Sequence, residues 1–127
     1  MIYESNLFDR IYKNSAKVKH EVREYQWGSI ESCTMYKNDD CESLRFVVNA
    51  FHDKDKSGRE KTTFSGWIAW SHPEYGAIDL FNSLNNSTMY DTLSDLMVDA
   101  VTGIAKKCED YTIWSMAEDA LEWLSLR

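Results

Sequence analysis

The sequence predicts a single α+β domain, residues 1–127, with a small antiparallel β-sheet of three or four strands, an N-terminal helix and a C-terminal helical hairpin. Two patterns predict this class. Apolar and polar residues alternate in the middle of the chain, as in half-buried strands, and apolar residues recur every three or four positions near its end, as on one helix face. The order helix, strands, helices favours helices packed mainly on one face of the sheet.

The N-terminal region is open to two interpretations. Residues 5–23 could form a helix, and we include it in the predicted fold. Residues 17–25 could instead pair as a strand. The apolar side of the helix would carry Leu7, Ile11, Val18 and Val22.

The middle of the chain is expected to form the sheet. Residues 44–51 alternate in polarity, and residues 62–70 follow them after a polar stretch, which indicates a hairpin with a long turn. A third strand is expected at 76–81, entered through a turn at 72–74. Residues 29–36 could add a strand before this hairpin.

The first C-terminal helix is expected over residues 88–108. Thr88 and Asp91 have the spacing of a capping box, and Lys106 and Lys107 lie in the last turn, where cations suit the helix dipole. The apolar face carries Tyr90, Leu93, Met97, Val101, Ile104 and Cys108.

A second helix is expected over residues 112–126, and the short connection favours a helical hairpin. Trp114 and Trp123 are expected to flank its apolar stripe rather than to lie at its centre. That stripe carries Ile113, Ala117, Leu121 and Leu124.

Strand alternation assigns residues to the two sheet faces. The helix-facing positions of residues 62–70 would be Phe64, Gly66, Ile68 and Trp70. Val47, Phe51 and Trp67 would then lie on the opposite face, where aromatic surface needs a cover. We expect the N-terminal helix to supply that cover, and a partner protein is the alternative.

The net charge of −7 lies entirely in the second half of the chain. Residues 1–61 contain 11 basic and 11 acidic residues, whereas residues 62–127 contain 3 basic and 10 acidic residues. Because nucleic-acid affinity rests largely on Lys and Arg, direct binding of DNA or RNA is disfavoured. A negative field favours association with basic protein surfaces, and solubility alone is the simpler explanation.

The sequence is that expected of a cytoplasmic protein. Its three cysteines form no CxxC pair, and an odd number suits a reducing compartment better than a disulfide framework. The first residues lack the pattern of a signal peptide, and no window reaches the roughly 18 apolar residues that a membrane helix requires.

Motifs for catalysis, metals and cofactors are absent from the sequence. Residues 53–58 resemble the first half of a calcium loop, but Phe64 stands where a bidentate carboxylate is needed. The histidines His20, His52 and His72 lack metal-ligand spacing, and no glycine-rich nucleotide motif occurs. We therefore predict no catalytic residue, no metal site and no cofactor.

One pattern favours a binding function. Asp91, Asp95 and Asp99 fall at i, i+4 and i+8 of the first expected helix, where like charges destabilise an isolated helix. A second acidic ridge on the next helix carries Glu118, Asp119 and Glu122. The alternative is an ordinary solvated face.

The leading hypothesis is a non-enzymatic protein-binding module of the inhibitor or adaptor type, whose acidic helices meet a basic surface of a partner protein, such as a surface that binds nucleic acid. Small acidic proteins of phages and mobile elements often act this way, which is an analogy of class. The partner-binding residues would be Asp91, Asp95, Asp99, Glu118, Asp119, Glu122 and Trp67.

Two other hypotheses stay open. The first is a small-molecule-binding or enzymatic domain with a pocket between sheet and helices, lined by Trp67, Trp70 or Trp114, with His52 or His72 as polar groups. The second is an obligate homodimer through the outer sheet face around Val47, Phe51 and Trp67.

Overall fold

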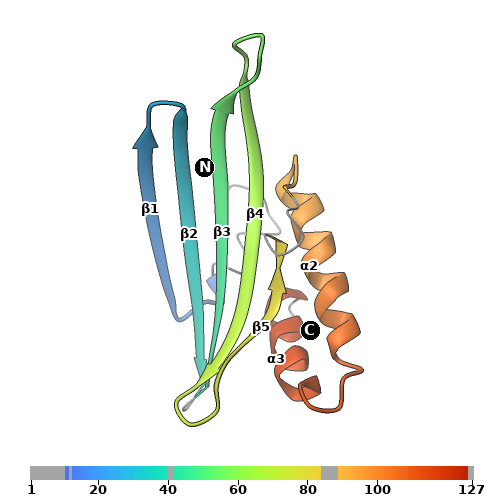
Figure 1. Cartoon of the computed structure of the whole chain (residues 1–127). Coiled ribbons are helices and arrows are strands. Elements are labelled where there is room, and N and C mark those ends of the chain that lie inside the picture. The colour runs from blue at the N-terminus through green and yellow to red at the C-terminus, as the bar shows by residue number, and fades with distance from the viewer. Residues whose placement is uncertain (1–10, 12, 40–41, 84–88, 126–127) are drawn as a thin grey trace.

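In the part of the chain that the structure describes, five antiparallel strands follow one another across one sheet, and two C-terminal helices lie beside it (Figure 1). The computed structural model describes residues 11, 13–39, 42–83 and 89–125. Each strand pairs with the next along the chain. The strands are β1 (Lys17–Tyr25), β2 (Gly28–Asp39), β3 (Glu42–Lys54), β4 (Glu60–His72) and β5 (Gly76–Asn82). The helices are α2 (Leu93–Lys107) and α3 (Trp114–Ser125).

The sheet has five strands rather than three or four, because the N-terminal region contributes β1. The predicted helix over residues 5–23 is therefore wrong from Lys17 onward, where the alternative strand over residues 17–25 is confirmed; residues 5–10 and 12 lie outside the described residues. Val18 and Val22 are four residues apart, an even spacing that also places both on one face of a strand. Pairing with β2 along the whole of β1 selects the extended conformation.

The remaining strands are confirmed at the expected places, 29–36, 44–51, 62–70 and 76–81. The turn between β3 and β4 closes the hairpin that the sequence predicts. The Asp55 carboxylate accepts hydrogen bonds from the backbone N–H groups of Ser57 and Arg59, at 2.9 and 3.0 Å. Gly58 follows Ser57 with a φ of 81°. The Ser57 hydroxyl also donates a hydrogen bond to the Asp55 carboxylate. All of these bonds lower the pKa of Asp55, and the bond from the hydroxyl has the largest effect.

The core lies between the sheet and the two helices, which Figure 1 shows next to β4 and β5. Trp123, expected beside the apolar stripe of its helix, is instead buried at 1% exposure. Ala120, one turn before Trp123, is also buried, so the apolar face of α3 is wider than predicted. The largest fully buried side chains of the core include Met35, Phe46, Ile68, Leu96, Met97, Ile104, Trp123 and Leu124.

Helix α2 begins later than its apolar pattern predicts. Tyr90 is extended, because its backbone exchanges two hydrogen bonds with Phe64 of β4, at 2.8 and 3.0 Å. The N-cap is Thr92, whose side chain accepts a hydrogen bond from the backbone N–H of Asp95 at 3.0 Å. The helix thus starts later than the expected capping pair: Asp91 lies before it, and Thr88 lies outside the described residues.

The outer sheet face carries Val47, Phe51 and Trp67, all half-buried, as predicted from strand alternation. The guanidinium of Arg45 lies 4.2 Å from the Trp67 ring centroid. None of the described helices covers this face. Ile11 is buried in the core on the helix side, and a cover supplied by residues 1–10 would lie outside the described residues.

Candidate functional site

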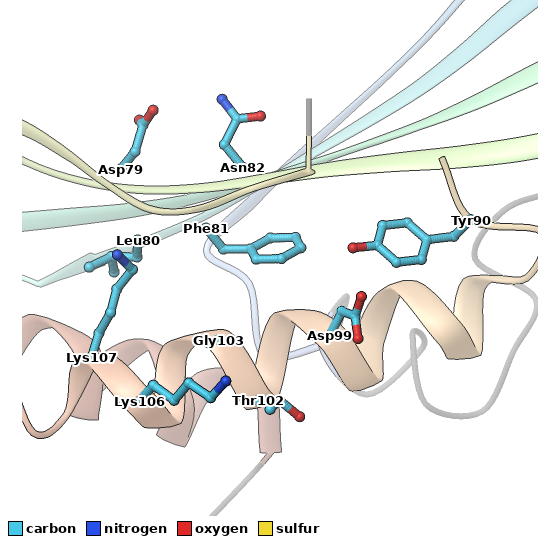
Figure 2. Close-up of a pocket in the computed structure, with 10 residues that line it drawn as sticks. All are labelled: Asp79, Leu80, Phe81, Asn82, Tyr90, Asp99, Thr102, Gly103, Lys106 and Lys107. Atoms are coloured by element: carbon cyan, nitrogen blue, oxygen red, sulfur yellow. The ribbon is translucent and has the colours of Figure 1, made fainter. Parts of the chain in front are cut away.

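A groove of about 460 Å³ runs between the edge strand β5 and helix α2. Residues 79–82 of β5 form one wall (Figure 2). The other wall is the side of α2 that carries Asp99, Thr102 and Lys106. These positions are three and four residues apart, so they share one helix face. Phe81 points from β5 toward the helix and lines the groove.

One end of the groove is closed by a hydrogen bond between the Tyr90 hydroxyl and the Asp99 carboxylate. Burial raises the pKa of Tyr90 to about 12, and the hydrogen bond to Asp99 and the charge of that carboxylate add to the shift. Tyr90 therefore remains a neutral donor, and Asp99 is turned toward the sheet instead of lying on an outer acidic ridge.

The other end of the groove carries Lys106 and Lys107; Lys107 reaches toward Leu80, whereas Lys106 extends along α2 toward Thr102 (Figure 2). Gly103 lies between the two ends. A Cβ atom at Gly103 would lie 3.5 Å from the Phe81 ring, which is an ordinary contact distance. The packing therefore does not require glycine here, but the absence of a side chain keeps the groove open. The groove thus has an acidic end, a floor without a side chain and a basic end.

A second candidate surface lies on α3, and we call it the acidic α3 surface. It consists of the exposed carboxylates Glu118, Asp119 and Glu122 with two exposed aromatic residues. Trp114 is 52% exposed, and Tyr111, just before the helix, is 89% exposed. The α3 sequence contains no Lys or Arg to offset these carboxylates. Exposed aromatic side chains in one region are typical of binding surfaces.

The structure separates the seven predicted partner-binding residues. Asp91 precedes α2, Asp95 lies in its first turn, and Asp99 faces the groove. The carboxylates Glu118, Asp119 and Glu122 stay together on α3. Trp67 lies on the outer sheet face, where its Nε1 donates a hydrogen bond to Asp79 at 2.7 Å, so it does not share a surface with the helices.

Sequence reasoning missed a cluster at the far end of the helix-facing sheet face. Glu31, 7% exposed, lies between two histidines. Its Oε2 is 3.3 Å from His20 Nε2, and its Oε1 is 3.6 Å from His52 Nε2. The sequence feature that could have indicated this cluster is an acidic residue at an inward-facing position of β2, two residues before the buried Cys33. Only the register of β1, β2 and β3 brings the histidines to it.

A hollow of about 380 Å³ adjoins this cluster at the turn between β1 and β2. His52 lines it, and its Nδ1 lies 3.0 Å from the Thr62 hydroxyl. Tyr25 and Trp27 also line it and stack on each other, with ring centroids 5.3 Å apart. His72, the alternative polar group for such a pocket, lies at the opposite end of β4, far from His52.

No group of three or more metal-ligating side chains is found among the residues that the structure describes. Within the same ranges, no helix is long and apolar enough to cross a membrane. Comparison with models of protein families, with curated proteins and with solved structures finds no match to this chain.

Proposed function

We propose that the protein is a non-enzymatic protein-binding module of the inhibitor or adaptor type, and that its acidic α3 surface contacts a basic surface of a cytoplasmic partner protein. One observation carries the proposal: three exposed carboxylates and two exposed aromatic residues gather on and just before a helix without cations.

The two kinds of side chain have different roles in this proposal. The carboxylates of Glu118, Asp119 and Glu122 steer the partner by long-range attraction, which raises the association rate. Trp114 and Tyr111 supply the apolar area that becomes buried in the complex. Lys37 borders a hollow of about 220 Å³ together with Asp119 and Glu122, and one cation leaves this surface net negative.

The test is capture of partners from a lysate of the source cells, followed by measurement of affinity for the captured protein. The variant is Glu118→Gln/Asp119→Asn/Glu122→Gln. We expect affinity to fall roughly tenfold, since each exposed charge pair contributes a fraction of a kcal/mol. Binding of the unmodified chain should weaken as salt rises.

A matched control is Glu24→Gln/Glu60→Gln/Glu74→Gln, which removes the same charge from exposed positions on the sheet and its turns. It should bind nearly as well as the unmodified chain. Equal losses in both variants would show that net charge alone matters, and no loss in the α3 variant would refute the assigned surface.

A second candidate function is small-molecule binding in the hollow beside His52. The observation that favours it is the contact of a buried carboxylate, Glu31, with two imidazoles next to stacked aromatic rings. Thermal-shift screening of a metabolite library would test it. A ligand whose stabilisation disappears in Trp27→Ala and His52→Ala would support this site, and a screen without such a ligand would count against it.

A further inference from the structure

Strand β1 is an edge of the sheet, and among the described residues it pairs with β2 alone (Figure 1). Its register with β2 runs from Lys17 to Tyr25 without a shift, so this edge carries no bulge. Every side chain of β1 except Val18 is exposed, and Val22 is 56% exposed. In an antiparallel ladder every second residue directs its N–H and C=O groups away from the partner strand, so β1 offers a template for another strand.

The charges of β1 are complementary to those of a second copy of the same strand. Two copies related by a two-fold axis pair antiparallel, and each contact occurs twice. With the axis at Val22, Glu21 of each copy lies opposite Arg23 of the other. The other opposed pairs in this register bring no like charges together: Lys19 with Tyr25, His20 with Glu24, and Val22 with itself.

The neighbouring registers bring like charges together. With the axis at Glu21, that carboxylate meets its own copy and Lys19 meets Arg23; with the axis at Arg23, that guanidinium meets its own copy. Like charges directly opposite each other destabilise a strand pair, and opposite charges stabilise it. An axis between two residues would oppose backbone groups that face β2 with groups that face outward. The sequence of β1 therefore selects the register centred on Val22.

The same charges disfavour other partners. Charged side chains on an edge strand usually prevent it from pairing with a foreign strand. A second copy is the exception, because it supplies an opposite charge to Glu21 and to Arg23. Lys19 Nζ and Glu21 Oε1 already lie 3.1 Å apart on one face of β1, and Arg23 of the second copy would extend this ion pair.

We propose that the protein forms a two-fold symmetric homodimer in which β1 pairs antiparallel with β1 of a second copy, centred on Val22, so that the two sheets become one. Pairing of residues 19–25 buries less than a standard interface of about 1,600 Å², so we expect a dissociation constant in the micromolar range. The helices lie next to β4 and β5, so the acidic α3 surface stays exposed in the dimer (Figure 1). The proposal thus goes beyond the function proposed above and does not depend on it.

The first experiment is sedimentation velocity of the full chain over a concentration series that spans the micromolar range. The sedimentation coefficient should rise from that of a monomer to that of a dimer and go no further, because the two-fold contact is closed. A monomer at every concentration, or growth beyond a dimer, would overturn the proposal.

Charge variants then test the opposed pair. Glu21→Lys and Arg23→Glu each place like charges opposite each other, so each should weaken self-association at least roughly tenfold. An equal mixture of the two variants should form a heterodimer, in which both opposed pairs are again complementary. The exchange Glu21→Arg/Arg23→Glu keeps the net charge and should form a dimer as the unmodified chain does.

The mixture and the exchange variant separate loss of the contact from loss of the fold. A dimer that persists in both single variants would lie elsewhere, such as on the outer sheet face, and would overturn the proposal. Failure of the mixture and of the exchange variant to form dimers would also overturn it, because the charges would then not be opposed.

Cross-linking tests the register. Val22→Cys places two thiols next to the axis, so a short bismaleimide should link the two copies. In Lys19→Cys the two thiols would lie about 20 Å apart at the rise of a strand, and this variant should link no more than the unmodified chain. Equal linking of both variants, or none above the unmodified chain in Val22→Cys, would overturn the register centred on Val22.

Discussion

At the scale of single residues, Gly28 is required by a close approach between strands. A Cβ atom at this position would lie 2.0 Å from the backbone oxygen of His52, which is far inside contact distance. Gly58, in the turn between β3 and β4, has a positive φ of 81° but open space around it. Both glycines have a positive φ, which is 154° at Gly28, so the overlap with His52 is what distinguishes Gly28 from Gly58.

We predict that Gly28→Ala lowers the free energy of unfolding by more than about 2 kcal/mol, because the backbone of two strands must move apart. Gly58→Ala should cost about 1 kcal/mol, since only the conformational preference of alanine opposes it. Urea denaturation of both variants measures the difference. Equal losses would show that the contact with His52 relaxes at little cost.

At the scale of elements, the first residue of α2 is determined by its N-cap, Thr92, and not by the pattern of apolar residues. Thr92→Ala removes the acceptor for the Asp95 N–H group and should lower the free energy of unfolding by about 1 kcal/mol. Thr102→Ala makes the same change inside the helix, where alanine is the better helix former, and should be neutral or stabilising. Urea denaturation checks both variants, and a neutral Thr92→Ala would contradict the assigned cap.

The strands and helices differ in how well the local sequence pattern predicts them. The alternation around Phe46 and Val48 correctly predicts β3, because one face of that strand is buried along its length. The region of β1 has apolar residues at a spacing that fits a helix and a strand equally well. The conformation of β1 is therefore decided by its pairing with β2. In α3, the burial of Trp123 shows that the width of a buried helix face depends on the elements that pack against the helix.

At the scale of the whole molecule, two buried acids of high pKa make stability sensitive to alkali. Burial and the charge of Glu31 raise the pKa of the Cys33 thiol from 9.0 to about 11. The pKa of Tyr90 rises from 10.0 to about 12. Both groups keep their protons longer in the folded chain, so their contribution is complete below pH 9 and is lost as the pH rises toward 11 and 12.

We predict that the free energy of unfolding falls by about 2 to 3 kcal/mol through the titration of Cys33, and by less through that of Tyr90, where solvent in the groove screens the Asp99 charge. Urea denaturation at a series of pH values measures it. Cys33→Ala should flatten the fall between pH 9 and 11, and Tyr90→Phe should flatten it between pH 10 and 12. Variants with the same pH slope as the unmodified chain would contradict these assignments.

The sequence by itself determined the α+β class, four of the five strands, the two C-terminal helices and the acidic character of α3, because each follows from periodicity or charge within a short segment. The tertiary structure decided the rest. Tyr90 is extended because it pairs with Phe64, 26 positions earlier, and the cluster around Glu31 and the groove along β5 exist through strand register and helix packing. Contacts between distant segments set these features, and no local pattern encodes them.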